Sequence, residues 1–255
     1  MSYFMEGKKY FFTIAFAFLF FYNAIAERLG FNDTLLPTAH KGYIIHHNYY
    51  TISYSEKDRQ AEWVAYPLTP QSIKGTQVRK NSFKPDPMVK QNPVVSKEYT
   101  KTGFDRGHLC PAADMKLNLN SMSESFYLSN ISPQFPGFNR GIWENLESKV
   151  REWAIEKNGL YVVTGSIINY QCGSISNETI PVPCFFYKII FKDFGSSKQM
   201  IAFLLPNESN DASLNSFITT VDKIEQLTGI DFFASLPNQT EELLESTIVT
   251  SNWSW

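Results

Sequence analysis

Short runs of apolar, aromatic and β-branched residues follow one another along most of the chain, as in proteins built around a β-sheet. These runs predict strands at residues 43–54, 61–66, 125–130, 160–165, 185–191 and 199–205. Apolar spacing close to 3.6 residues, with glycine stops, predicts helices at residues 139–158, 214–228 and 241–246. We therefore expect an α+β fold with a central, mainly antiparallel sheet flanked by helices.

Residues 70–100 break this pattern, because they carry four prolines and show no clear period. Such a segment predicts a long, ordered surface loop, and surface loops are common carriers of functional residues. The segment holds Arg79, Lys80 and Lys84, and we expect it to bring these cations to a substrate groove. An ordinary solvated basic surface is the alternative role for these side chains.

The first 26 residues have the three parts of a secretory signal peptide. A pair of lysines precedes an apolar stretch at residues 10–21, and Ala26 ends a small-residue cleavage pattern. Cleavage after Ala26 would leave residues 27–255 as one domain without a stable membrane span, secreted or periplasmic. An uncleaved membrane anchor is the alternative, although the apolar stretch is short for a span.

The overall charge gives no sign of nucleic-acid binding, but the distribution of charge does. The chain of 255 residues has a formal net charge of −2, with 43% hydrophobic and 19% charged residues, which is ordinary for a globular protein. Residues 74–106 nevertheless hold eight Lys and Arg against three acids, whereas residues 211–255 hold seven acids against one lysine. The basic segment can attract a polyanion toward the residues at its end.

The residues at that end suit the hydrolysis of a phosphodiester with one hard metal ion. His108 is the expected general base, because imidazole titrates closest to neutral pH. The guanidinium group of Arg106 is planar and permanently charged, so it can stabilise the negative charge that develops in the transition state. Gly107, which lies between them, is expected to keep the backbone open where the substrate approaches.

Asn139 and Glu147 complete this expected site from a helix. Asn139 offers a neutral oxygen to Mg²⁺, or to Mn²⁺ as the alternative metal, and Glu147 and Asn130 can hold the water molecules of the metal. Eight residues separate Asn139 from Glu147, which is close to two helical turns and places both on roughly one side. The alternatives are a helix-capping asparagine and an exposed glutamate.

The chain has three cysteines, which are Cys110, Cys172 and Cys184. Cys172 and Cys184 lie at facing ends of two strands that we expect to be neighbours, so we predict a disulfide between them in an exported protein. Cys110 is left over, two residues from His108. It is either a buried small hydrophobe or a nucleophile paired with that histidine. The nearby arginine and the Asn139–Glu147 pair have no purpose in a cysteine mechanism, which favours the buried role.

Several blocks of the sequence, in matching order, resemble the DNA/RNA non-specific endonucleases, a family that includes mitochondrial endonuclease G and secreted bacterial nucleases. The blocks are Asp105-Arg-Gly-His108, Asn130-Ile-Ser-Pro-Gln134, Asn139, Trp143 and Glu147, with further matches at residues 61–66, Arg79 and residues 161–165. The resemblance extends over residues 43–235. An ordered set of this kind is a strong signal, whereas Asp-Arg-Gly-His alone would be a modest one.

The resemblance implies a ββα-metal nuclease fold and gives the matched residues their roles. It implies His108 as the general base, Asn139 as the direct metal ligand, and Glu147 as the acid that orients water on the metal. The remaining implied roles are phosphate contact for Arg79 and Arg106, and support of the site for Asp105, Asn130 and Arg140. Of these, Arg140 lies at a position where family members vary.

The function that we expect is an exported, Mg²⁺-dependent endonuclease that hydrolyses DNA and RNA without sequence preference. No helix-turn-helix or zinc-finger pattern is present in the sequence, and phosphate contacts carry no base information. The alternatives are a catalytically inactive nucleic-acid-binding protein and a phosphodiesterase that acts on a non-polymeric substrate. The resemblance leaves room for a homodimer and for an inhibitor protein, although no feature of the sequence requires either.

Overall fold

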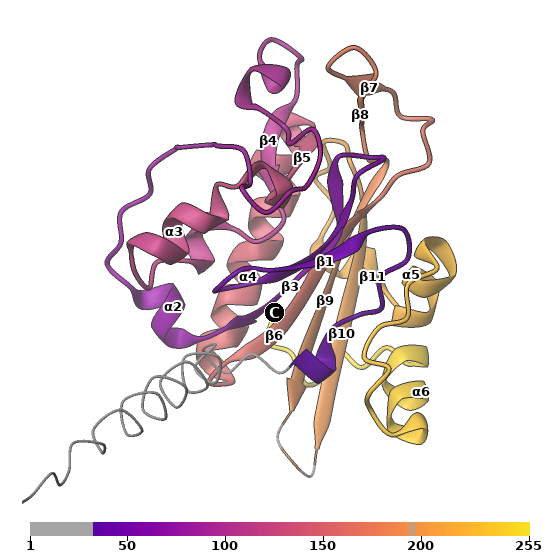
Figure 1. The fold of residues 1–255 in the computed structure, drawn as a ribbon. Coiled ribbons are helices and arrows are strands. Elements are labelled where there is room, and N and C mark those ends of the chain that lie inside the picture. Colours follow the sequence, from indigo (N-terminus) through magenta and orange to yellow (C-terminus); the bar gives the residue numbers. More distant parts are fainter. Residues whose placement is uncertain (1–32, 194, 196) are drawn as a thin grey trace, which may run out of the picture. The chain divides into compact units, whose positions relative to one another are not determined.

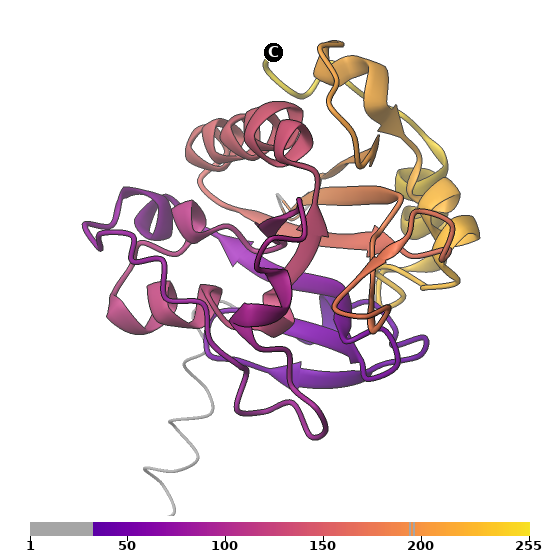
Figure 2. The same cartoon turned by 90° about the horizontal axis from the view of Figure 1, so that it is seen from above.

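Figures 1 and 2 show the computed structural model, which describes residues 33–255 with the exception of 194 and 196. Within this part of the chain, seven strands form one antiparallel sheet in the order β1-β2-β3-β6-β9-β10-β11. Their bounds are β1 Tyr43–His46, β2 Thr51–Ser55, β3 Gln60–Leu68, β6 Leu160–Ile167, β9 Phe185–Asp193, β10 Lys198–Pro206 and β11 Ile218–Thr219. The predicted central antiparallel sheet is confirmed.

Different helices cover the two faces of this sheet. Successive side chains of a strand point to opposite faces, so each central strand contributes residues to both cores. On β9, Phe186 and Ile190 belong to the core under helix α4 (Trp143–Glu156). Tyr187 and Ile189 belong to the opposite core, under α5 (Val221–Thr228) and α6 (Asn238–Ser246). Figure 1 shows α4 on one side of the sheet and the two C-terminal helices on the other.

A small ββα unit stands beside the sheet and carries the expected catalytic residues. Strand β4 (Asp105–His108) pairs antiparallel with β5 (Ile131–Gln134), with His108 opposite Ile131, and α4 follows. A Cβ at Gly107 would lie 2.1 Å from the Gln134 side chain. Gly107 therefore allows β4 to pack closely on Gln134, which corrects the expectation that it opens the backbone to substrate.

The remaining elements are short. They are α2 (Pro70–Lys74), α3 (Leu119–Ser125), β7 (Ser174–Ile175) and β8 (Ile180–Pro181). Residues 70–100, predicted as a long loop, thus begin with a helix, which the side chain of Thr69 caps by accepting from the Ser72 N–H. The rest of that segment runs over the surface as expected, with one further 3₁₀ turn at Ser96–Tyr99.

Two predicted strands are wrong in detail because tertiary contacts and caps override local composition. Residues 43–54 form two strands, and in the turn between them the carboxylate of Glu124 accepts from both the backbone and the side chain of Asn48. Residues 125–130 are not a strand. Asn118 caps α3 by accepting from the Ser121 N–H at 2.9 Å, this helix runs to Ser125, and a 3₁₀ turn at Leu128–Asn130 follows, so β5 starts only at Ile131.

Two predicted helices start later than expected. A π turn at Phe138–Ile142 precedes α4, and Gly141 in this turn has φ −118° and ψ −111°, outside the helical range. Asn139 therefore lies before α4 and does not cap it. The predicted helix at residues 214–228 is a 3₁₀ turn, then β11, then α5. Thr220 starts α5 by accepting from the Lys223 N–H, and Gly229 ends it with φ +71°.

The structure also bears on the cysteines and on the N-terminus. A disulfide joins Cys172 to Cys184, with 5.5 Å between the Cα atoms, so the predicted pair is joined.

The expected signal peptide, residues 1–26, lies outside the described residues. Among the residues that are described, no helix combines the length and the apolar character that a membrane crossing requires.

Candidate active site

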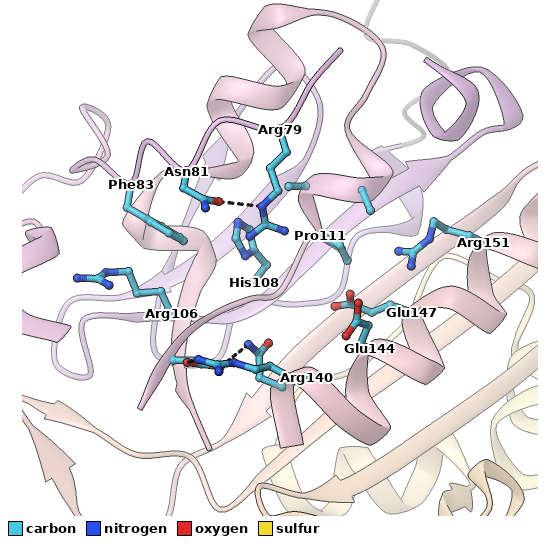
Figure 3. Close-up of a pocket in the computed structure, with 14 residues that line it drawn as sticks. Arg79, Asn81, Phe83, Arg106, His108, Pro111, Arg140, Glu144, Glu147 and Arg151 are labelled. Carbon is cyan, nitrogen blue, oxygen red and sulfur yellow. Dashed lines mark hydrogen bonds and ion pairs between the residues drawn. The ribbon is translucent and has the colours of Figure 1, made fainter. Parts of the chain in front are cut away.

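A cavity of about 510 Å³ opens between β4, the start of α4 and residues 79–83 (Figure 3). Seven of the residues singled out from the sequence line it, namely Arg79, Asp105, Arg106, His108, Asn139, Arg140 and Glu147. Asn81, Phe83, Pro111, Ala112, Ala113, Glu144 and Arg151 complete the lining. The fold thus gathers four arginines, three carboxylates, one histidine and two asparagines around one opening.

His108 is the last residue of β4 and is buried between two phenylalanines. Its ring centre lies 5.4 Å from that of Phe83 and 5.0 Å from that of Phe126, and the residue is only 8% exposed. None of the described residues forms a hydrogen bond with Nε2. Burial, helped by the charge of Arg79, lowers the pKa of His108 to about 3. The imidazole is therefore neutral near pH 7, as a general base must be.

Arg79 and Arg106 bring their guanidinium groups to the cavity from different segments. Arg79 donates from Nε to Asn81 Oδ1 at 2.8 Å, and Figure 3 shows it next to His108. Arg106 lies over the rings of Phe83 and Tyr99, at 5.5 and 5.7 Å from their centres. The single hydrogen bond of Arg79 leaves its terminal nitrogens available for an anion, whereas one terminal nitrogen of Arg106 donates to the Ser96 carbonyl at 2.6 Å and to the Thr100 hydroxyl at 3.5 Å.

Asp105 fixes Asn139 and Arg140, not the neighbouring Arg106. Its carboxylate accepts from Arg140 Nε at 2.7 Å and from a terminal Arg140 nitrogen at 2.6 Å, and also from Asn139 Nδ2 at 2.9 Å. Burial raises the pKa of Asp105, but these hydrogen bonds outweigh it and the pKa ends below its usual value. The bond to Nδ2 leaves Oδ1 of Asn139 as the oxygen that the side chain can offer to a cation.

Glu147 and Arg151 line the cavity from successive turns of α4. Burial is the main reason that the pKa of Glu147 is raised to about 7, and the positive charge of Lys188 is the largest influence against that rise. Arg151 donates to Asp114 at 3.0 Å, and the hydroxyl of Tyr66 donates to the other oxygen of that buried carboxylate at 2.9 Å. Arg151 is thereby held beside Glu147, as Figure 3 shows.

Asn130 and Cys110 lie behind the cavity and do not line it. Asn130 is fully buried, accepts from the Cys110 N–H at 2.8 Å, and donates to the carbonyls of Cys110 and Ser125 at 2.9 Å. It therefore fixes the chain that follows His108, and the expectation that it holds the water of a metal is wrong. Cys110 is 0% exposed, which contradicts the alternative in which it is a nucleophile.

Neither of the two lysines predicted to bind substrate reaches the cavity. The ammonium of Lys84 donates to Ser123 Oγ at 2.5 Å and lies 4.7 Å from the ring centre of Tyr127. Lys80 is exposed next to Arg79 but is not part of the lining. The basic segment therefore delivers Arg79 to the site, and Lys80 and Lys84 remain at its periphery.

The donors in the cavity fit a hard divalent cation that keeps part of its water. Asn139 offers one amide oxygen, and Glu144 and Glu147 offer carboxylate oxygens from α4. Oxygen donors of this kind suit Mg²⁺, Mn²⁺ or Ca²⁺ and not a soft metal. Among the described residues, the only cluster of three His, Cys, Asp or Glu ligand atoms within 4.8 Å is Asp222, Glu225 and Glu245, none of which lines this cavity.

Comparison with known proteins decides the family. The family model for DNA/RNA non-specific endonucleases matches residues 31–239. The chain belongs to this family. Over 211 residues it is 36% identical to nuclease C1 of Cunninghamella echinulata var. echinulata, covering 75% of this chain and 82% of the relative. Over 204 residues it is 30% identical to human mitochondrial endonuclease G, covering 73% and 68%.

A solved structure supports the ββα-metal nuclease fold of this non-specific endonuclease. The crystal structure of the EndoG/EndoGI complex, which concerns the mechanism of EndoG inhibition, superposes with a TM-score of 0.71 at 28% identity. The match covers 79% of this chain and 90% of that chain. The fold that the sequence resemblance implied is confirmed.

Sequence reasoning missed two lining residues of this endonuclease, Glu144 and Arg151. A signal for Arg151 was available, because it follows Glu147 by four residues and side chains at that spacing share one side of a helix. The same signal was available for Glu144, because it precedes Glu147 by three residues and this spacing also places side chains on one side of a helix.

Proposed function

We propose that this family member is an exported, Mg²⁺-dependent endonuclease that hydrolyses phosphodiester bonds in DNA and RNA, with His108 as its base. One observation carries the proposal. A buried imidazole, neutral near pH 7 and with Nε2 free of any described partner, opens on a cavity lined by four arginines. A neutral base beside several fixed cations is what attack on an anionic diester requires.

In the proposed reaction, His108 takes a proton from a water molecule as that water attacks the phosphorus, and the bond from phosphorus to the leaving sugar oxygen breaks. Arg79 and Arg106 then face the negative charge that gathers on the non-bridging oxygens. Burial, and after it the charge of Arg79, lowers the pKa of His108, which keeps the base neutral before attack. Glu147, on the α4 side of the cavity, accepts hydrogen bonds from the water there and fixes its orientation.

The metal would be held by Oδ1 of Asn139, with the Glu147 carboxylate available to its water molecules. When bound, Mg²⁺, or Mn²⁺ in its place, supplies a positive charge that stabilises the leaving oxygen. Asp105 prepares Asn139 for this role by binding Nδ2, and Arg140 fixes Asp105 in turn. The side chain is therefore oriented by two hydrogen-bonded neighbours before a cation arrives.

A substrate panel tests whether the substrate is a polymer. The arginines of the cavity bind phosphate, and phosphate contacts carry neither base nor sugar information, so we propose cleavage of both DNA and RNA. Duplex DNA, single-stranded RNA, a cyclic nucleotide and bis(p-nitrophenyl) phosphate would be compared at equal phosphodiester concentration. Faster hydrolysis of both polymers than of either small diester supports the proposal. Preference for a small diester would move the protein to the phosphodiesterase class.

The pH dependence of cleavage should follow Glu147 and not His108. The pKa of His108 lies at about 3, so the base is neutral over the working range, whereas that of Glu147 lies at about 7. Because the proposed role of Glu147 needs the ionised form, kcat/KM should rise with pH through this region. A bound cation will move that rise to lower pH. Profiles of the wild type and of Glu147→Gln test this, and an unchanged acid limb in the variant would contradict it.

We also propose that residues 1–26 are removed on export and that residues 27–255 form the mature domain. The lysine pair, the apolar stretch and the cleavage pattern at Ala26 support this proposal. Some relatives carry names that place them in mitochondria, so the compartment needs its own test. The intact mass of the protein recovered from its native host should correspond to a chain that begins at Glu27. A mass that includes Met1 would contradict cleavage.

A further inference from the structure

Three acidic side chains converge between α5 and α6, in the acidic C-terminal part of the chain. A carboxylate oxygen of Asp222, one of Glu225 and one of Glu245 all lie within 4.8 Å of one another. Asp222 and Glu225 are three residues apart on α5 and so share one side of that helix, whereas Glu245 comes from the end of α6. Oxygens that bind one Ca²⁺ lie about 2.3–2.6 Å from it, which allows two of them to be about 5 Å apart. The spacing therefore permits one shared cation.

Glu245 is the one residue of α6 that is buried. It is only 4% exposed, and no described residue donates a hydrogen bond to its Oε1. The two apolar residues of α6 hold the helix weakly, because Leu244 is only partly buried against the core and Leu243 is 63% exposed. A surface helix normally packs through an apolar stripe, and a buried carboxylate without a partner is costly. The unpartnered oxygen of Glu245 is therefore an independent sign of a missing ligand beside Asp222 and Glu225.

No lysine or arginine within the described part of the chain forms an ion pair with these three acids. Lys223 is the only cationic residue of 211–255, and its ammonium donates to Gln226 Oε1 at 2.9 Å. Glu225 Oε1 accepts from the Phe232 N–H at 2.8 Å, which leaves the second oxygen of that carboxylate for another partner. Carboxylates this close repel one another unless a proton or a cation lies between them.

We propose that Asp222, Glu225 and Glu245 form a Ca²⁺ site that fastens α6 to α5. Ca²⁺ takes about six to eight oxygen ligands in a flexible geometry, and the exposed position of Asp222 lets water complete the shell. Mg²⁺ demands a stricter geometry and is usually bound through one or two carboxylates, so three carboxylates favour Ca²⁺. Both helices cover the face of the sheet opposite α4 (Figure 1), so the role of this site is structural and is independent of the function proposed above.

Calorimetric titration of the metal-free protein with CaCl₂ tests the site without any activity measurement. Asn139→Ala serves as the background, because it lacks the ligand proposed for the active site. In this background Glu245→Gln should weaken the binding of one Ca²⁺ by more than about tenfold. Glu242→Gln, an exposed position of the same helix outside the cluster, should leave that binding unchanged. Equal Ca²⁺ binding by the two variants, or no Ca²⁺ binding by the background protein, would overturn the proposal.

Thermal unfolding in the same background distinguishes a bound cation from a shared proton. Ca²⁺ at about a hundred times its Kd should raise the unfolding midpoint by about 5–10 °C relative to EDTA, and MgCl₂ at the same concentration should raise it less. Glu245→Gln should lose this response, although in EDTA it should be at least as stable because one repelling charge is gone. Asp222→Asn, at an exposed position, should lose the response too and decides the matter if Glu245→Gln does not fold. A midpoint that is the same in Ca²⁺ and in EDTA would overturn the proposal.

Discussion

Replacement of His108 by alanine should lower kcat for plasmid cleavage by about 10²–10⁴-fold, the usual contribution of a general base. KM should change little, because the arginines that bind phosphate remain in place. The residue lies between Phe83 and Phe126 without a described bond to Nε2, so the variant removes a base without breaking a hydrogen bond to that atom. Initial rates at saturating Mg²⁺, with the DNA concentration varied, separate kcat from KM.

His46→Ala is the matched control for this prediction. His46 is an exposed histidine on β1 and does not line the cavity, so its loss should leave kcat within the error of the assay. Circular dichroism and the unfolding midpoint should show that both variants are folded. A folded His108→Ala protein that cleaves DNA at the rate of the His46→Ala protein would remove His108 from the mechanism.

Asn139→Ala should abolish the response to metal as well as most of the activity. Asn139 is the residue whose free oxygen is prepared by Asp105, so its loss removes the only direct protein ligand that we propose. Loss of a supporting group around a metal site costs about 10–100-fold in affinity, and loss of the ligand itself should cost more. Calorimetric titration of the protein with Mg²⁺ measures this loss without relying on catalysis.

Arg140→Ala distinguishes the ligand from its support. Arg140 supports Asn139 through Asp105, which it holds at 2.6 and 2.7 Å, and its side chain is 70% exposed. The variant should therefore weaken metal binding less than Asn139→Ala does, and more metal should restore its activity. If Asn139→Ala binds Mg²⁺ as tightly as the wild type, the metal site lies elsewhere.

Much of the fold could be predicted from the sequence because its buried elements are strongly patterned. The stretches around residues 160–165, 185–191 and 199–205 are nearly continuous apolar runs, and each is a strand within β6, β9 or β10. Residues 43–54 and 125–130 could not be predicted in the same way. Glu124 fixes the turn in the first from more than 70 positions away, and the cap by Asn118 makes the chain before the second helical.

For the site, the sequence predicted which residues line the cavity better than it predicted the contacts that each side chain makes. His108, Asn139 and Glu147 line one cavity, as the spacing and the resemblance suggested. Asn130 does not, because its side-chain amide forms hydrogen bonds with the backbone of Cys110. No pattern in the sequence distinguishes an asparagine that binds backbone from one that lines a cavity. Lys188 was part of a predicted apolar strand, and only the packing of β9 under α4 shows that its charge is buried near the site.

The most direct test of the proposed function is digestion of supercoiled plasmid and of single-stranded RNA by the protein that begins at Glu27, with Mg²⁺ and with EDTA. The arrangement of His108, Asn139 and the arginines predicts cleavage of both polymers with Mg²⁺ and of neither with EDTA. Excess Mg²⁺ added back after EDTA should restore both reactions. Tight binding of both polymers without cleavage under any of these conditions would contradict the proposal and assign the protein to the binding class.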